Sequence, residues 1–223
     1  MSDYDTLMGL LMARHSCRGF LDQEVPADLI GQVVTAAGRA PSWCNAQPWQ
    51  VIVTRGEETD RLREALMAAA GTRAEAPDVP GPEAYTGAHR DRRRTCGWQL
   101  YDAVGVEKGD RVGSAKQALE NFNLFGAPHT AILTSGRELG AYGALDSGGF
   151  LMAFCLAAQA LGLATVPQAA VAFHSDVVRE VLGIPEDRLI LCAITFGYED
   201  SSHPANAFRT DRADLPEIME IRG

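Results

Sequence analysis

The interpretation of this sequence depends on two stretches, Arg14-His15-Ser16-Cys17-Arg18 and Pro41-Ser42-Trp43-Cys44-Asn45-Ala46-Gln47-Pro48-Trp49. The first places three side chains that can carry positive charge close together, and arginine offers a planar fork that matches phosphate oxygens. In the second, two prolines restrict the backbone and Trp43 offers a flat apolar face. The two stretches together suit a ligand that carries a phosphate and a planar ring system.

Each stretch also has a plainer interpretation. Apolar residues recur at helical spacing over 4–13, and if that helix extends to Arg18, then Arg14 and Arg18 share one of its faces. Positive side chains at a helix end also complement the helix dipole, so a solvated basic terminus is an alternative. The loop can likewise be a rigid connection between a helix and a strand, with Trp49 in the core.

Composition limits the class of protein. The 223 residues suffice for one large domain with its own core, and 46% hydrophobic with 22% charged residues is ordinary for a globular chain. The net charge of −9 argues against a nucleic-acid partner but allows a local basic pocket. Five scattered cysteines without a Cys-x-x-Cys pair argue against a disulfide framework and a zinc site, so reduced thiols and no metal are expected.

The sequence predicts a cytoplasmic protein without a membrane segment. Residues 1–5 include two acids and no basic region, unlike a secretory signal. The most apolar segment, 150–166, contains Gln159 and Gly162 and falls short of a convincing membrane span. We expect it to be a buried helix.

Hydrophobic periodicity and turn residues predict the order of elements along a single domain, 1–223. The expected elements are helices over 4–13 and 26–38, a strand over 49–54, a helix through Leu62 and Leu66, a loop-rich excursion over 71–113, a helix ending near Phe125, a strand over 130–134, an apolar helix over 141–163, a helix capped by Ser175, a strand over 189–196 and an extended tail from Gly197.

The excursion over 71–113 is rich in Pro, Gly and Arg, and a loop of this length inside a domain is more often functional than decorative, so it is a candidate lid. Its Arg90, Arg92, Arg93 and Arg94 could receive a carboxylate or a phosphate group of a ligand. Charge runs usually lie in water, which favours a solvated basic face instead.

The two opening stretches, together with later segments of the chain, resemble the FMN-dependent nitroreductase family. That family carries Arg-(Arg/His)-Ser-x-Arg, followed by Ala-Pro-Ser-x-x-Asn-x-Gln-Pro-Trp leading into a strand. The matching segments here span almost the whole chain: Arg14 to Arg18, Ala40 to Trp49, Asn121 to Pro128, a helix from Asp146, Gly162 to Gln168, and a strand leading to Gly197-Tyr198. The branch that reduces nitrobenzoate-like aromatics is the most similar, through Pro167-Gln168-Ala169-Ala170 and Arg209-Thr210-x-Arg212.

The resemblance implies an α+β, nitroreductase-like fold with a central mixed or antiparallel sheet surrounded by helices. It also implies an intertwined homodimer with an extended C-terminal tail and with FMN at the subunit interface. The partner subunit would supply the Pro41 loop to each flavin. A monomer would then lack a complete site.

The resemblance further implies roles for sixteen residues around the flavin. Those near the phosphate, ribityl chain and pyrimidine edge would be Arg14, His15, Ser16, Arg18, Arg209 and Arg212; those from the partner would be Pro41, Ser42, Trp43 and Asn45; those along the isoalloxazine edge near N5 would be Pro167, Gln168, Ala169 and Ala170; Asn121 and Asp146 would complete the set. Ala169-Ala170 stands where many relatives carry Glu-Gly, so only backbone contact with the flavin is expected there.

The implied activity is hydride transfer from NAD(P)H to FMN and then to a nitroaromatic or quinone-like acceptor, in a ping-pong order, with no side chain as nucleophile. Free cysteines usually behave as small hydrophobes, so Cys17 and Cys44 receive no thiol role. Two alternatives stay open: a dehalogenase or flavin-modifying enzyme of the same fold, and a flavin-binding storage or sensor protein without turnover.

Overall fold

A computed structural model describes residues 2–223, and a four-stranded antiparallel sheet in the order β1-β2-β4-β3 organises it. The strands are β1 Trp49–Thr54, β2 His129–Gly136, β3 Ala164–Gln168 and β4 Arg188–Gly197. The α-helices are α1 Asp3–Ala13, α2 Ala27–Ala37, α3 Glu57–Ala69, α4 Gly87–Ala103, α5 Arg111–Leu119, α6 Gly140–Ala160, α7 Ala169–Ala172, α8 Ser175–Leu182 and α9 Leu215–Ile218; the 3-10 turns are η1 Trp43–Asn45, η2 Leu124–Gly126, η3 Arg137–Leu139 and η4 Pro204–Asn206. The α+β class and the antiparallel sheet are confirmed.

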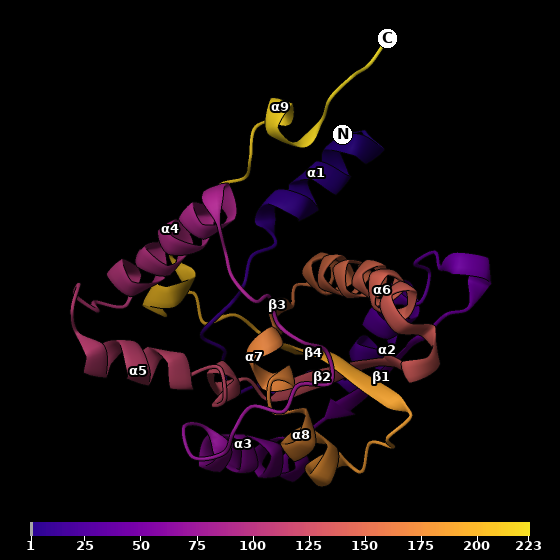
Figure 1. The fold of residues 1–223 in the computed structure, drawn as a ribbon. Coiled ribbons are helices and arrows are strands. Elements are labelled where there is room, and N and C mark those ends of the chain that lie inside the picture. The colour runs from indigo at the N-terminus through magenta and orange to yellow at the C-terminus, as the bar shows by residue number, and fades with distance from the viewer. Residues whose placement is uncertain (1) are drawn as a thin grey trace.

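Helices cover both faces of the sheet. Every residue of β2 is buried, because β2 lies between two strands and two helical layers. Successive side chains of a strand point to opposite faces. Leu133 accordingly packs in the core cluster with α2 and α6, whereas Ile132 packs in the cluster with α3, α7 and α8. Figure 1 shows α2 and α6 on one side of the sheet and α3 and α8 on the other.

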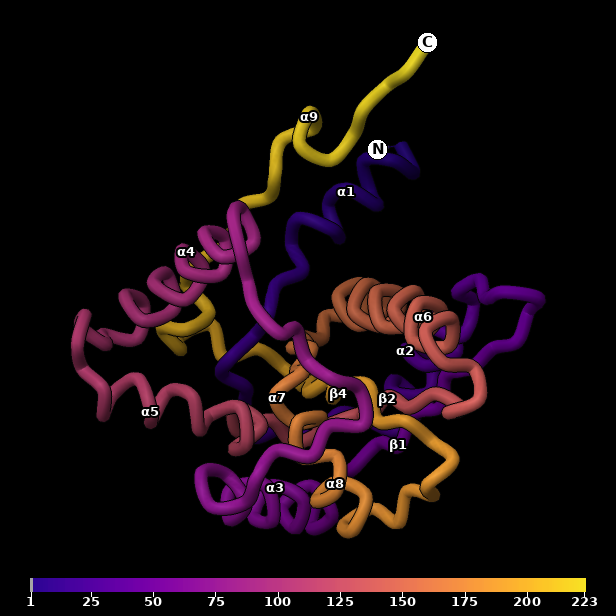
Figure 2. Tube along the Cα trace, viewed as in Figure 1, coloured from indigo at the N-terminus to yellow at the C-terminus, as the bar shows by residue number. Residues whose placement is uncertain are grey.

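The ends of the chain leave this layered body. In Figure 2, α1 and the C-terminal tail project from the same end of the molecule, and α4 lies beside that end. The tail contains short turns and lies away from the sheet. A cavity lies where α1, α4 and the tail meet.

Three local expectations differ from the structure. The segment 71–113 contains the seventeen-residue helix α4, although its composition suggested loops. The helix expected to end near Phe125 ends at Leu119 and is followed by turns, in which Leu124 and Phe125 take left-handed backbone angles with φ of 52° and 51°. Ser175 does not cap α8 but begins it, and its hydroxyl donates to the Ala172 carbonyl at 2.7 Å.

Strand β3 is an element that the sequence pattern did not predict. It is five residues long and contains Pro167, which lacks the N–H that a central strand requires. Among the four strands its neighbour is β4, so β3 lies at the edge of the sheet, where proline is tolerated.

The long helix α6 is apolar on most of its surface. The segment 137–160 has a mean hydropathy of 1.3, which is long and apolar enough for a membrane span by length and composition alone. In the fold, Phe150 and Phe154 of α6 pack into the core against Phe196 and Trp49. Tyr142 and Leu145 on another side of the same helix are exposed. The helix is therefore a core element with one uncovered face.

Candidate functional site

The stretch Arg14 to Arg18 is extended rather than helical. Helix α1 begins with a capping box between Ser2 and Asp5 and ends at Ala13, and Arg14 has φ −60° and ψ 127°. Ser16 then forms a parallel bridge with Thr165, and the Cys17 N–H donates to the Thr165 carbonyl at 3.0 Å. The expectation that Arg14 and Arg18 share a helical face is wrong, because pairing with the edge of β3 replaces helical hydrogen bonds.

One side chain of this stretch is buried and four line a cavity. Cys17 is fully buried and its thiol donates to the Gly19 carbonyl at 3.1 Å. Burial raises the pKa of Cys17 to about 11, so the thiol stays protonated at neutral pH. Arg14, His15, Ser16 and Arg18 instead line the cavity.

The C-terminal segment joins this stretch through Asn206 of η4. The Asn206 Oδ1 accepts the Arg18 N–H at 2.7 Å, and its Nδ2 donates to the carbonyls of Gly19 and Asp200, each at 2.9 Å. The Asn206 carbonyl accepts from the Arg209 guanidinium at 2.8 Å. Asn206 thus links Arg18 near the N-terminus to Arg209 near the C-terminus, through its side-chain amide and its backbone carbonyl respectively.

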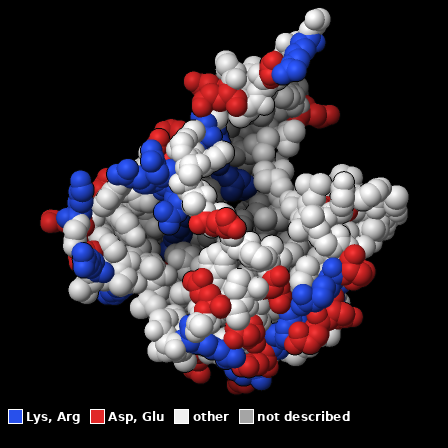
Figure 3. Space-filling view, viewed as in Figure 1, with Lys and Arg blue, Asp and Glu red and all other residues white. Residues whose placement is uncertain are grey.

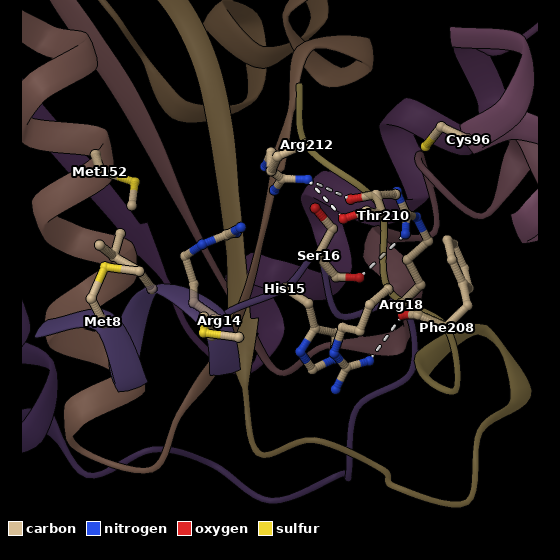
Figure 4. Close-up of a pocket in the computed structure, with 13 residues that line it drawn as sticks. Met8, Arg14, His15, Ser16, Arg18, Cys96, Met152, Phe208, Thr210 and Arg212 are labelled. Atoms are coloured by element: carbon tan, nitrogen blue, oxygen red, sulfur yellow. Dashed lines mark hydrogen bonds between the residues drawn. The ribbon is translucent and has the colours of Figure 1, made fainter. Parts of the chain in front are cut away.

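The resulting cavity has a volume of about 710 Å³, within the usual range for ligand sites. Six of the predicted flavin residues line it, namely Arg14, His15, Ser16, Arg18, Arg209 and Arg212. Its other lining residues are Met8, Leu11, Met12, Cys96, Met152, Phe208 and Thr210. Figure 4 shows the labelled arginines and the sulfur-containing side chains of Met8, Met152 and Cys96 around this space.

The cations of the cavity are only partly neutralised. The Arg14 Nε is buried and has no hydrogen-bond partner among residues 2–223. The Arg18 Nη1 donates to the Ser16 carbonyl at 3.2 Å, and burial lowers the pKa of Arg18. His15 Nδ1 lies 3.1 Å from the Ala13 carbonyl, while its Nε2 lies 3.2 Å from a Glu199 carboxylate oxygen without hydrogen-bond alignment. Such a set of donors suits a bound anion.

The Pro41 loop lies elsewhere, beside the start of α6. The Trp43 N–H donates to Asp146 Oδ2 at 3.0 Å, and the ring centroids of Trp43 and Tyr142 lie 4.3 Å apart. Trp43 remains 59% exposed, and Asn45 takes a left-handed φ of 56°. Pro41, Ser42, Trp43, Asn45 and Asp146 therefore form a second group that does not line the cavity of the same chain.

The third group surrounds the junction of β3 and α7. Gln168 is buried; its Nε2 donates to the Asn121 carbonyl at 2.8 Å, and its Oε1 accepts from Thr195. The Gln168 side chain is thus used inside the protein and leaves only backbone groups for a ligand. Ala169 is exposed and Ala170 is half-buried. Pro167 precedes them in β3, so the five residues of this group lie together.

The four arginines of α4 are not equivalent. Arg90 pairs with Asp91 at 3.0 Å, and Arg92 pairs with Glu217 of α9 at 2.8 Å. Arg93 instead stacks on Tyr85, with its guanidinium carbon 5.3 Å from the ring centroid. All are exposed. Figure 3 shows blue Lys and Arg side chains gathered around the hollow between α4 and the body.

Sequence reasoning missed several residues of the cavity wall. Cys96 comes from α4 and Met152 from α6, and nothing in the local pattern distinguishes either residue from an ordinary helix position. Asn206 is also missed, although its buried amide organises the site. All five cysteines are free.

The fold and the cavity define an α+β protein with an arginine-rich anion pocket built from both ends of the chain. The family model described as the nitroreductase family matches residues 11–198, and the chain belongs to that family.

Known relatives agree along most of the chain. It is 37% identical over 213 residues to "Nitroreductase NfnB" of Mycolicibacterium smegmatis, covering 95% of this chain and 91% of the relative. It is 32% identical to a "4-nitrobenzoate reductase" of Nocardioides sp., covering 91% and 84% of the two chains. A crystal structure of the FMN-dependent NfnB from Mycobacterium smegmatis in complex with NADPH superposes with a TM-score of 0.95 at 34% identity over the whole of both chains.

Proposed function

We propose that this protein is an FMN-dependent oxidoreductase that takes hydride from NAD(P)H and reduces nitroaromatic or quinone-like acceptors in a ping-pong order. The observation that carries this proposal is the cavity that joins Arg14 and Arg18 with Arg209 and Arg212. The relatives support it, because they include an FMN-dependent enzyme with bound NADPH and a reductase of 4-nitrobenzoate.

The residues present fit FMN. The buried Arg14 Nε lacks a partner among residues 2–223 and can donate to a phosphate oxygen. Arg18, Arg209 and Arg212 would add charge around the phosphate, and His15 and Ser16 would add donors to it and to the ribityl chain. When bound, FMN accepts and donates hydride at its N5 atom. The backbone groups of Pro167, Gln168, Ala169 and Ala170 would pass that edge.

The Pro41 loop would serve the flavin of a second copy, so the complete unit is a homodimer. Exposed apolar side chains support this part of the proposal: Tyr4 and Met12 on α1 are 69% and 74% exposed, and Leu145 on α6 is 69% exposed. Monomeric proteins rarely leave such faces uncovered. Pro41, Ser42, Trp43, Asn45 and Asp146 would border the ring of the partner's flavin, and Asn121 would support Gln168.

The rest of the chain's organisation follows the same proposal. Residues 1–223 form one flavin-binding domain, and α4 with its flanking loops in 71–113 serves as the lid over the cavity that Cys96 lines. The protein works in the cytoplasm, and its acceptor is a small aromatic molecule.

The first test is the visible absorption spectrum of the purified protein, before and after NADPH is added without oxygen. We expect flavin bands that bleach and that return when a nitroaromatic is added. Bands that bleach without return would favour a storage or sensor protein. A protein that neither contains nor binds FMN would contradict the proposal.

Arg14→Ala tests the phosphate assignment separately. We expect a folded protein that loses FMN, because the substitution removes a charged donor buried in the cavity. The matched control is Arg55→Ala, since Arg55 is exposed and pairs with Glu24 far from the cavity residues. Full retention of FMN by Arg14→Ala would count against the phosphate site.

A further inference from the structure

A second cavity adjoins the first and has no role in the proposed function. It has a volume of about 750 Å³ and lies between the loop before α4, the α4 surface and the tail. Three residues, Cys96, Thr210 and Arg212, line both cavities. A ligand that entered the first cavity at one end would therefore have room for its other end in the second.

The wall of the second cavity contains one free cation from α4. Arg92 is neutralised by Glu217, and this ion pair joins α4 to α9. Arg93 makes no ion pair with any residue of 2–223, and its guanidinium lies over the Tyr85 ring. Stacking on an aromatic face leaves the edge N–H donors of a guanidinium free and holds them in place.

The cavity is mixed in charge, and this affects which anion it can hold. Asp91, Asp211 and Glu217 also line it, although Asp91 is tied to Arg90 and Glu217 to Arg92. Within residues 2–223, the arginines of this wall without a carboxylate partner are Arg93 and Arg212. Arg212 also lines the first cavity, where the proposed function assigns it to the FMN phosphate. Arg93 is therefore the cation left for a second phosphate monoester, which carries about two negative charges and three acceptor oxygens.

We propose that the second cavity binds the adenosine end of NADPH and that Arg93 recognises its 2′-phosphate, which makes this enzyme prefer NADPH to NADH. The inference rests on the proposed function, because it assumes that the nicotinamide end enters the first cavity. It names a specificity residue: Arg93 contacts the part of the reductant that does not react.

The test compares Arg93→Gln with the matched control Arg94→Gln, because Arg94 is exposed on the same helix, lies outside the cavity wall and neutralises no carboxylate of that wall. We expect Arg93→Gln to raise the KM for NADPH about tenfold while the KM for NADH and the kcat stay near wild type, because one charge-assisted contact is lost. Arg94→Gln should match wild type. Equal changes for both nucleotides, or no change, would overturn the proposal.

A binding measurement tests the 2′-phosphate site separately from the proposed reductase activity. Titration calorimetry should show that the FMN-loaded wild type binds adenosine 2′,5′-bisphosphate more tightly than adenosine 5′-monophosphate, and that Arg93→Gln removes the difference. Equal binding by wild type would overturn the subsite even if the enzyme turns over. If neither nucleotide is oxidised but the difference in binding persists, the proposed function fails and the subsite stands.

The alternative ligand for Arg93 is the carboxylate of an aromatic acceptor. With NADPH saturating, wild type and Arg93→Gln should share the same KM for the acid acceptor, 4-nitrobenzoate, and the same KM for the neutral acceptor, nitrobenzene. A KM that rises for the acid alone, with both nucleotides unaffected, would assign Arg93 to the acceptor and overturn the proposal.

Discussion

His129 is buried in an apolar setting yet has both ring nitrogens bonded. Its Nε2 accepts the Val25 N–H at 2.8 Å, and its Nδ1 donates to the Thr54 carbonyl at 3.2 Å. The ring stacks on Phe196 with centroids 5.3 Å apart. Only the neutral imidazole can make both bonds, since a proton on Nε2 would face another N–H.

This arrangement predicts a loss of stability in acid. Burial lowers the pKa of His129 in the folded protein, so the unfolded chain binds a proton more readily below its own pKa of about 6.5. The contribution is therefore fully present above that pH and lost as the pH falls from it toward the lower folded pKa. The free energy of unfolding, measured with urea, should therefore fall between about pH 7.5 and about pH 5.5. This pH dependence should weaken in His129→Gln and persist in His89→Gln, because His89 is exposed in the wild type. The same pH dependence in the wild type and in both variants would contradict the role given to His129.

Asn206 connects the stretch Arg14 to Arg18 with Arg209 of the C-terminal segment. Asn206→Asp keeps the shape but replaces the donor that faces the Gly19 and Asp200 carbonyls with a carboxylate. We expect the free energy of unfolding to fall by about 1–3 kcal/mol, because two donors are lost and a carboxylate then faces two carbonyl oxygens. FMN should bind more weakly, because this repulsion displaces the turn whose Oδ1 and backbone carbonyl accept from Arg18 and Arg209. Fluorescence titration of FMN measures the second effect. The control is Asn123→Asp, because the side-chain amide of Asn123 donates to Glu120 and lies outside the cavity wall. An unchanged affinity for FMN in Asn206→Asp would show that other contacts hold Arg18 and Arg209 in place.

At the scale of elements, the first part of the 71–113 segment is a strap fixed to the body. The Ala76 N–H donates to the Phe173 carbonyl at 2.8 Å. Asp78, with a side chain only 14% exposed, binds Arg179 at 2.6 Å and accepts the Ile190 N–H at 2.8 Å. A movement of the lid would therefore begin after the strap, nearer α4.

Asp78→Ala should destabilise the protein by about 3 kcal/mol, because it removes the close carboxylate partner of a largely buried Arg179 and leaves the Ile190 N–H without its acceptor. Glu186→Ala is the matched control: Glu186 pairs with the same Arg179 at 3.6 Å but is 85% exposed, so its loss should cost less than about 0.5 kcal/mol. Thermal unfolding compares the two, and limited proteolysis should cut the Asp78→Ala strap first. Equal stability of both variants would contradict this role for the strap.

At the scale of the molecule, three segments carry large apolar side chains that the chain itself leaves uncovered. They are Tyr4 and Met12 of α1, Leu145 of α6, and Ile218 and Ile221 near the C-terminus, all at least 69% exposed. Large exposed apolar surface usually marks an interface. The tail that carries Ile221 extends away from its own body, as a segment that wraps a second copy would.

Leu145→Glu should convert the proposed dimer to monomer and reduce FMN content, because a charge would be buried against the partner. Met67→Glu on α3 is the control, since it is 39% exposed on the helical layer across the sheet and should leave assembly unchanged. Light scattering coupled to size exclusion gives the mass, and the absorption spectrum gives the flavin content. A wild-type monomer that holds FMN would contradict the shared site.

Part of the site follows from local sequence and part does not. The residue types of Arg14, Ser16 and Arg18 suit phosphate, and these residues do line one cavity with Arg209 and Arg212. Their backbone was predicted wrongly, because the bridge between Ser16 and Thr165 joins residues distant in the sequence. The local sequence did not predict that Cys96 and Asn206 belong to the site, because their positions depend on where α4 and η4 pack.

The sequence by itself determined the family, the α+β class, most helices and strands, and the residue types of the anion pocket. Those properties depend on periodicity and motif chemistry, which are local. Only the tertiary structure decided that Arg14 to Arg18 is extended, that Gln168 turns inward, and that Arg93 rather than Arg90 or Arg92 is free of an ion pair. The first two outcomes and the ion pair of Arg92 are set by partners far away in the chain, namely Thr165, Asn121 and Glu217, whose proximity no local pattern encodes.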